Sequence, residues 1–358
     1  MAGPDSSARG AHQGLLEKLR RVAQVRVAVP LLVGVGLLAY VISIAVAPES
    51  GDQLWHSFQQ TWWIVLVLTF PYLALRALVW HGLLKELRIE VPWRSMLVSF
   101  AGGEITKSLP AGVYVQNYLL ARLEHFGHTR VARATMASTA MLGLEAAAAM
   151  PVALVVGWPG QPWVRWTLLG VVAAWIAALG LAWLLVHYGA KHMSDRTPAW
   201  LRRLTMFLDE FLEAGGELLT WRTARALVPT ALYMLVYVID LYAIMRALGI
   251  QQVSFLSTVG IYAFVVLSVI LVPIPTEVGL TEFSGLMALV AYGIPQPLAA
   301  VAILALRAQG TGMTIVVASG LLFVLRHELA TAASDDPAHP ATSRPGTGSI
   351  GQGDQIPR

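Results

Sequence analysis

The sequence predicts an all-α, polytopic membrane protein with about seven or eight transmembrane helices and one or two broken or re-entrant segments. Composition is the first observation behind this prediction. Of 358 residues, 56% are hydrophobic and only 13% are charged, and the mean hydropathy is +0.62. Soluble domains carry about 25% charged residues, so about half of the usual charge is missing. One soluble core does not absorb this much apolar surface, whereas a lipid bilayer does.

The second observation is the recurrence of apolar stretches of about 20 residues, the length that spans a hydrocarbon core of about 30 Å. The uninterrupted stretches are residues 27–47, 62–84, 134–157, 166–187, 227–248, 255–272 and 298–325. Two further stretches, 96–120 and 273–292, are interrupted by Gly, Pro or charged residues. We therefore expect a basic N-terminus over residues 1–26, a transmembrane domain over 27–325, and a disordered, Pro- and Gly-rich tail over 326–358.

The charges of the loops predict the orientation, because Lys and Arg concentrate on the cytoplasmic side. The loop at 48–61 contains Glu49 and Asp52 but no Lys or Arg, so we expect it outside. We expect a plasma-membrane protein with a cytoplasmic N-terminus. The side of the C-terminus depends on whether 273–292 crosses the bilayer or forms a second re-entrant hairpin. Four basic residues precede the first span: Lys18, Arg20, Arg21 and Arg26.

The segment 96–120 is predicted to be a re-entrant hairpin. Basic residues flank it on both sides, so both of its ends are expected in the cytoplasm. Its centre contains Gly102, Gly103, Pro110 and Gly112, which are poor residues for a lipid-facing helix. Irregular backbone survives at membrane depth only where protein or a water-filled cavity covers it. We therefore expect neighbouring spans to surround this segment.

A cytoplasmic amphipathic helix is predicted over residues 199–221. Its apolar residues follow helical spacing, and acidic residues lie mostly between them. Such a helix fits the headgroup plane of a membrane, and the alternative is a soluble helix packed on the loops. The apolar positions are Leu201, Leu204, Leu208, Phe211, Leu212, Leu218 and Leu219.

Ionisable residues inside the apolar segments are the candidates for function. Each costs about 2.5–3.5 kcal/mol at the centre of a membrane helix, so such residues usually face a bundle interior and a partner. Arg307 stays charged and therefore needs an anion, either a protein carboxylate or a substrate headgroup. Arg76 and Asp240 lie closer to the ends of their spans, and a structural role is an equal alternative for both. The predicted substrate-binding or translocation residues are Glu104, Lys107, Glu145, Glu277, Glu282 and Arg307.

Other chemistries find no support in the sequence. The chain has no cysteine, which excludes disulfides, thiolate nucleophiles and Cys-ligated metals. It contains no HExxH, GxSxG or Walker motif, so we expect no catalytic site, no metal and no cofactor. The formal charge of +4 is typical of basic cytoplasmic loops that face anionic lipid, and nucleic acid is not an expected partner.

The two broken segments resemble a known family. Residues 273–282 read PIPTEVGLTE, and the apolar run that follows ends in Gly293-Ile294-Pro295. Together with Leu109-Pro110-Ala111-Gly112, this pattern resembles the lysylphosphatidylglycerol synthase transmembrane family, also called the flippase-like domain. The resemblance covers about residues 27–325 and implies the same membrane fold. Aminoacyl-transferring members append a large soluble C-terminal domain, so the resemblance concerns the membrane part only and does not imply synthase activity.

The function hypothesis follows from the broken segments and the buried charges. Paired interrupted segments indicate a transport site near the bilayer midplane, so we expect a transporter of a lipid or lipid-linked headgroup. Membrane lipids with anionic headgroups are then the expected partners. The alternative is a non-transporting accessory or scaffold subunit of a membrane glycosyltransferase or cell-envelope assembly complex, with a membrane protein as its partner. A lipid-modifying enzyme with Glu145 or Glu282 as base is a weaker alternative, because no nucleophile stands at helical spacing beside either.

Overall fold

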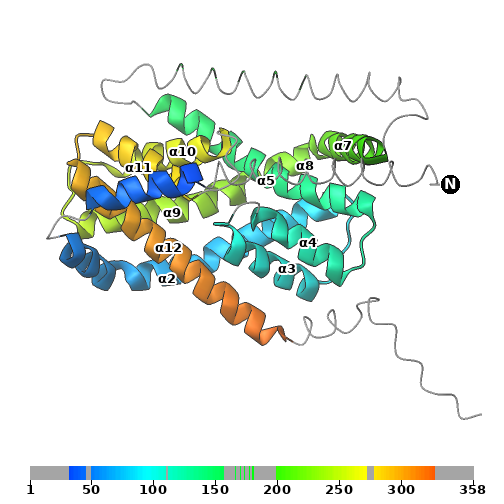
Figure 1. Ribbon diagram of the computed structural model, residues 1–358, viewed down its shortest axis with the longest axis horizontal. Coiled ribbons are helices and arrows are strands. Elements are labelled where there is room, and N and C mark those ends of the chain that lie inside the picture. Colours follow the sequence, from blue (N-terminus) through cyan, green and yellow to red (C-terminus); the bar gives the residue numbers. More distant parts are fainter. Residues whose placement is uncertain are drawn as a thin grey trace, which may run out of the picture.

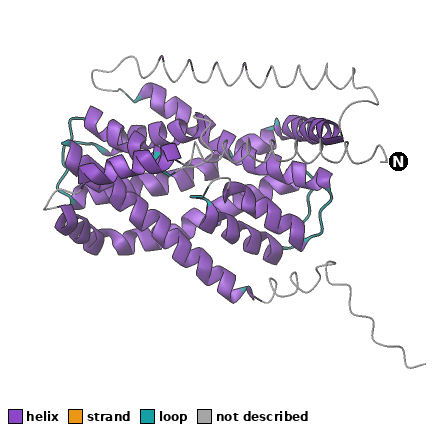
Figure 2. Ribbon diagram, viewed as in Figure 1, coloured by secondary structure: helices purple, strands orange, loops and turns teal. Residues whose placement is uncertain are grey.

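The computed structural model describes residues 32–45, 50–109, 112–156, 199–271 and 278–326, with isolated positions between 166 and 180. Within these ranges the chain forms helices, turns and loops but no strand (Figure 2). The prediction of an all-α protein is therefore confirmed. The span predicted at 166–187 and the terminal segments 1–26 and 327–358 lie outside the described residues, apart from the isolated positions.

Four of the described helices are long and apolar enough to cross a membrane. They are α2 (Ser50–Glu86), α5 (His128–Val155), α9 (Leu227–Ala247, continuing from α8) and α12 (Gln296–Val324). Shorter apolar helices are Leu32–Ala45, α10 (Phe255–Leu271) and α11 (Leu280–Ala291). These helices confirm a multi-pass helical membrane protein.

The long helices form one bundle, with smaller elements gathered at its ends (Figure 1). Helix α2 packs along α9 and α12, while α10 contacts both α5 and α11. Helices α3 (Trp93–Thr106), α4 (Val115–Leu123), α7 (Ala199–Leu218) and α8 (Trp221–Arg225) lie toward one end, and α11 lies toward the other (Figure 1). The bundle interior is thus enclosed by helices that are far apart in the sequence.

The hairpin predicted over 96–120 is present as two antiparallel arms, α3 and α4, joined by a turn and a short 3₁₀ helix (Gly112–Tyr114). Glycines allow the arms to pack closely: a Cβ on Gly102 would lie 2.3 Å from Leu119 Cδ1, and one on Gly103 would lie 2.7 Å from Gln116 Cβ. Helix α3 also packs on α12, and α4 packs on α5. Both arms of the hairpin are therefore packed against long helices of the bundle.

The expectation of a loop over residues 48–61 is wrong for residues 50–61, which form the first turns of α2. Polar residues interrupt the apolar pattern there, but Ser57 and Thr61 are buried. Thr61 Oγ1 donates a hydrogen bond to Gln309 Oε1 on α12 at 2.8 Å. The contact between Thr61 and Gln309 ties these first turns of α2 to α12 inside the bundle. With 37 residues, α2 is about 55 Å long, so it tilts or extends beyond the hydrocarbon core.

The amphipathic helix predicted over 199–221 is divided into α7 and the start of α8, because Thr220 caps the N-terminus of α8. Helix α7 packs on α5 through Ala214 and Leu218, which are both buried. Arg133 of α5 pairs with Glu210 at 3.1 Å and also with Glu217. In the part of α7 whose side chains are described, this helix therefore packs against protein along one face.

Candidate functional site

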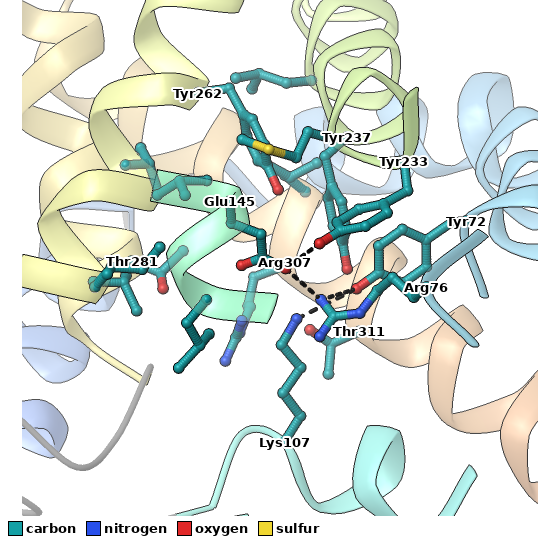
Figure 3. A pocket seen from close by; sticks show the side chains of 18 of the residues that line it. Tyr72, Arg76, Lys107, Glu145, Tyr233, Tyr237, Tyr262, Thr281, Arg307 and Thr311 are labelled. Atoms are coloured by element: carbon teal, nitrogen blue, oxygen red, sulfur yellow. Dashed lines mark hydrogen bonds and ion pairs between the residues drawn. The ribbon is translucent and has the colours of Figure 1, made fainter. Parts of the chain in front are cut away.

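A cavity of about 110 Å³ lies inside the bundle, where α2, α5, α9, α10 and α12 converge (Figure 3). Lys107, just beyond α3, and Thr281, in the first turn of α11, complete its wall. Both broken segments thus contribute to the lining. A water molecule occupies about 30 Å³ in the liquid, so the cavity has room for a few waters or for a small charged group.

Arg76 links three helices at one side of the cavity. Its Nε lies 3.1 Å from Glu104 Oε1 on α3, and its Nη1 lies 3.2 Å from Glu145 Oε1 on α5. Arg76 is only 5% exposed and Glu104 equally so. Charges buried this deeply persist only when they are paired, so each residue of this triad depends on the others.

Tyrosine hydroxyls extend the triad into a network (Figure 3). Tyr72 accepts hydrogen bonds from Arg76 Nη1 at 3.0 Å and from Lys107 Nζ at 3.3 Å. Tyr233 donates to Glu145 Oε1 at 2.8 Å. The Arg76 guanidinium carbon also lies 5.5 Å from the centre of the Tyr72 ring and 5.4 Å from that of Tyr233. The two tyrosines thus supply hydrogen bonds through their hydroxyls and cation–π attraction through their rings.

Arg307 joins the two broken segments on the other side of the cavity. Its Nε lies 3.0 Å from Glu282 Oε1, in the first turn of α11. Its Nη2 donates to Ser108 Oγ, just after α3, at 3.1 Å. The second oxygen of Glu282 accepts a hydrogen bond from the Gly279 N–H at 2.6 Å. Glu282 therefore caps the N-terminus of α11, where a negative charge is favoured.

Gly279 has φ +84°, a conformation that L side chains rarely adopt. A Cβ there would lie 1.8 Å from the carbonyl oxygen of Gly34 on the first described helix. Only glycine satisfies both requirements. Gly279 of the PIPTEVGLTE stretch thus has a local structural reason, because this turn starts α11 and places Glu282 against Arg307.

The charges are distributed unevenly around the cavity. Arg76, Lys107, Arg307 and Glu145 line it, a formal excess of two positive charges. Glu104 and Glu282 do not line the cavity and lie behind the arginines with which they pair. In the described part of the chain, the hydrogen-bond partner of the Lys107 ammonium is a phenol and not a carboxylate. The side chains that line the cavity are therefore cationic on balance, while the whole cluster is neutral once Glu104 and Glu282 are counted.

The structure brings five of the six predicted site residues around this cavity: Glu104, Lys107, Glu145, Glu282 and Arg307. The sixth, Glu277, lies outside the described residues. Asp240 is buried on α9 but does not line the cavity. The described residues contain no group of three His, Cys, Asp or Glu that could hold a metal ion.

Sequence reasoning missed the tyrosines and left Arg76 outside the list of predicted site residues. Arg76 seemed close to the end of its span and equally suited to a structural role. One available signal was charge balance, since Glu145 in mid-span needs a cation. A second was spacing, since Tyr72 lies one helical turn from Arg76 on the same face of its helix.

Comparison with known proteins places the chain in a family. The sequence model described as the lysylphosphatidylglycerol synthase TM region matches residues 27–318. Neither the comparison with curated proteins nor that with solved structures gives a match. The matched region includes α2 to α11 and most of α12, and so includes every residue of the cavity wall.

Proposed function

This chain belongs to the family of the lysylphosphatidylglycerol synthase TM region, and from that premise we propose that it moves a lipid or lipid-linked headgroup between the leaflets of the plasma membrane. The family is one of membrane proteins of lipid metabolism or of flippase type. The observation that carries the proposal is a cationic cavity inside the bundle, walled by both broken segments. Transporters bind their substrates at such interrupted segments near the bilayer midplane.

An anionic headgroup fits the donors that face the cavity. A guanidinium has five N–H donors, and in the described part of the chain Glu282 and Ser108 engage the Nε and Nη2 groups of Arg307. Lys107 has three donors, of which one is directed at Tyr72. The remaining donors suit phosphate oxygens, because charge-assisted hydrogen bonds to phosphate are among the strongest in proteins.

Exchange of partners at Arg307 supports a transport cycle. Breaking a buried ion pair without replacement costs about 3–5 kcal/mol, so Glu282 and Arg307 hold α11 and α12 together while no anion is bound. A phosphate that binds Arg307 replaces the carboxylate, and Glu282 keeps its hydrogen bond to Gly279. Binding would thereby loosen α12 from α11 and from the turn at Ser108, at the cost of leaving the buried Glu282 carboxylate with the Gly279 N–H in place of its cation.

Purified protein in proteoliposomes tests the proposal. We expect protein-dependent transbilayer movement of labelled phosphatidylglycerol, which is anionic, and much slower movement of zwitterionic phosphatidylcholine. The cationic lining is the reason for this preference. Protein-free vesicles give the background rate. No movement above background for any of a broad panel of headgroups, with folded protein, would contradict the proposal.

The second candidate is a non-enzymatic accessory or scaffold subunit of a membrane glycosyltransferase or envelope-assembly complex. One observation favours it: Leu219 and Trp221 are strongly exposed at the corner between α7 and α8, where a partner protein would cover them. Capture in mild detergent separates the candidates, since a stoichiometric membrane partner in the absence of lipid movement supports the scaffold.

A further inference from the structure

An apolar groove of about 400 Å³ lies beside the cavity, between α5, α9 and α10. Helix α5 contributes Ala149 and Val152, α9 contributes Ala231 and Leu232, and α10 contributes Val259. Apart from the Tyr262 hydroxyl, the lining side chains are hydrocarbon or thioether, and none is charged. All three helices place alanines along the groove, and these short side chains leave the space between the helices unfilled.

The groove and the cavity share part of their wall. Met234 and Tyr262 line both of them. Tyr262 stacks on Tyr237, another cavity residue, with ring centres 5.6 Å apart. These two side chains stand between the spaces, so a molecule that reached both would pass them, with a charged part on the cavity side and a hydrocarbon part on the groove side.

The groove also opens to the outside of the described bundle. Val228 and Leu232 on its rim are 65% and 49% exposed. Water is a poor occupant, because a buried water needs about three polar partners and this lining offers almost none. Empty apolar space is also unfavourable, with a cost that rises with its volume. A hydrocarbon chain from the bilayer satisfies both conditions.

We propose that this groove holds one hydrocarbon chain of a lipid whose anionic headgroup lies in the cavity. The inference rests on the proposed function and narrows its substrate: the protein recognises an anionic amphiphile by its chain as well as by its headgroup. Soluble phosphate compounds and short-chain lipids with the same headgroup are then poor substrates.

Filling the groove tests the inference. Ala231→Phe places an aromatic ring in the groove from an exposed position, so the fold tolerates it. Ala147→Phe is the matched control, because Ala147 is exposed on α5 and does not line the groove. The probes are dioleoyl- and dihexanoyl-phosphatidylglycerol, with binding followed by native mass spectrometry and movement followed in proteoliposomes.

We expect Ala231→Phe to weaken dioleoyl-phosphatidylglycerol binding by about tenfold or more, because overpacking excludes the chain. The Ala147→Phe variant and the wild type are expected to agree with each other and to prefer the dioleoyl lipid. Equal binding by Ala231→Phe and Ala147→Phe, with movement still lost in Arg307→Gln, overturns the groove inference and leaves the transport proposal standing. Unchanged movement in Arg307→Gln contradicts the role of Arg307 in headgroup binding, and no movement above background in the wild type contradicts the transport proposal itself.

A competing occupant is the chain's own segment 166–187. Since the chain has no cysteine, double-cysteine variants report its position without background. Leu232→Cys is paired with single cysteines placed through 166–187, and the protein is oxidised in membranes. We expect no disulfide. An efficient crosslink whose yield is not lowered by dioleoyl-phosphatidylglycerol means that this segment covers the groove. That result overturns the inference.

Discussion

Arg307 Nε and Glu282 Oε1 lie 3.0 Å apart and connect α12 with the first turn of α11. Glu282 is almost fully buried, whereas the Arg307 side chain is 22% exposed and faces the cavity. The pair is therefore asymmetric: the carboxylate is fixed by the Gly279 N–H, and the guanidinium keeps one side open to a ligand. In this account the same arginine holds the bundle closed and recognises the headgroup.

The first prediction concerns Glu282→Gln. A neutral amide leaves the partly buried Arg307 without its counterion and weakens the cap of α11, so we expect a loss of up to about 3 kcal/mol in unfolding free energy. Thermal unfolding in detergent measures this as a lower midpoint. Glu90→Gln is the control, because Glu90 is exposed and its substitution is expected to change nothing. A midpoint for Glu282→Gln equal to that of the control would show that the pair contributes little to stability.

The second prediction concerns the triad around Arg76. Arg76→Gln leaves two buried carboxylates, Glu104 and Glu145, without a cation, so we expect destabilisation of about 3–5 kcal/mol. The double variant Arg76→Gln/Glu104→Gln removes one of the two orphaned charges and is expected to recover part of the loss. A double-mutant cycle on denaturant unfolding gives the coupling free energy. Simple additivity of the two single losses would contradict the triad.

The third prediction isolates the tyrosine hydroxyl on Glu145. Tyr233→Phe keeps the ring over Arg76 but removes the hydrogen bond to Glu145, which costs about 1–3 kcal/mol for a buried charged acceptor. Tyr118→Phe, at an exposed ring on α4, serves as the comparison. We expect the unfolding free energy to fall for Tyr233→Phe only. An equal effect in both variants would mean that the hydroxyl of Tyr233 has no special role.

The fourth prediction concerns α7. Arg133 holds Glu210 and Glu217 of this helix to α5, and all three side chains are partly buried. Arg133→Gln is expected to release α7 and to raise hydrogen exchange of the amides in residues 199–218 by about fivefold or more. Arg130→Gln, one helical turn earlier on α5, is the control. Unchanged exchange in Arg133→Gln would show that apolar packing alone fixes α7.

Helix positions were predictable because apolar length and periodicity are local properties. The described helices α5, α9, α10 and α12 begin or end within a few residues of the predicted spans at most boundaries. The start of α2 was not predictable, because contacts with α12, such as that between Thr61 and Gln309, stabilise its polar first turns. Thr61 and Gln309 are 248 positions apart, so a local sequence pattern does not reveal their contact.

The same reason limits prediction of the site. The charged residues that gather around the cavity could be identified from the sequence, because an ionisable group in an apolar span is costly to bury and needs a partner. The identity of each partner depends on how helices far apart in sequence meet. Arg307 and Ser108 are 199 positions apart, and Tyr233 and Glu145 are 88 apart. The asymmetry of the cavity, whose lining includes Arg76 and Arg307 but not their partners Glu104 and Glu282, emerges only from that packing.

The most direct test of the account is the rate at which labelled phosphatidylglycerol crosses proteoliposome membranes that contain Arg307→Gln. Arg326→Gln is the matched control, because Arg326 lies just beyond the end of α12 and does not line the cavity. We predict a fall of about tenfold or more for Arg307→Gln, the effect of losing one charge-assisted contact to phosphate, and no change for Arg326→Gln. Undiminished movement by folded Arg307→Gln protein would contradict the account.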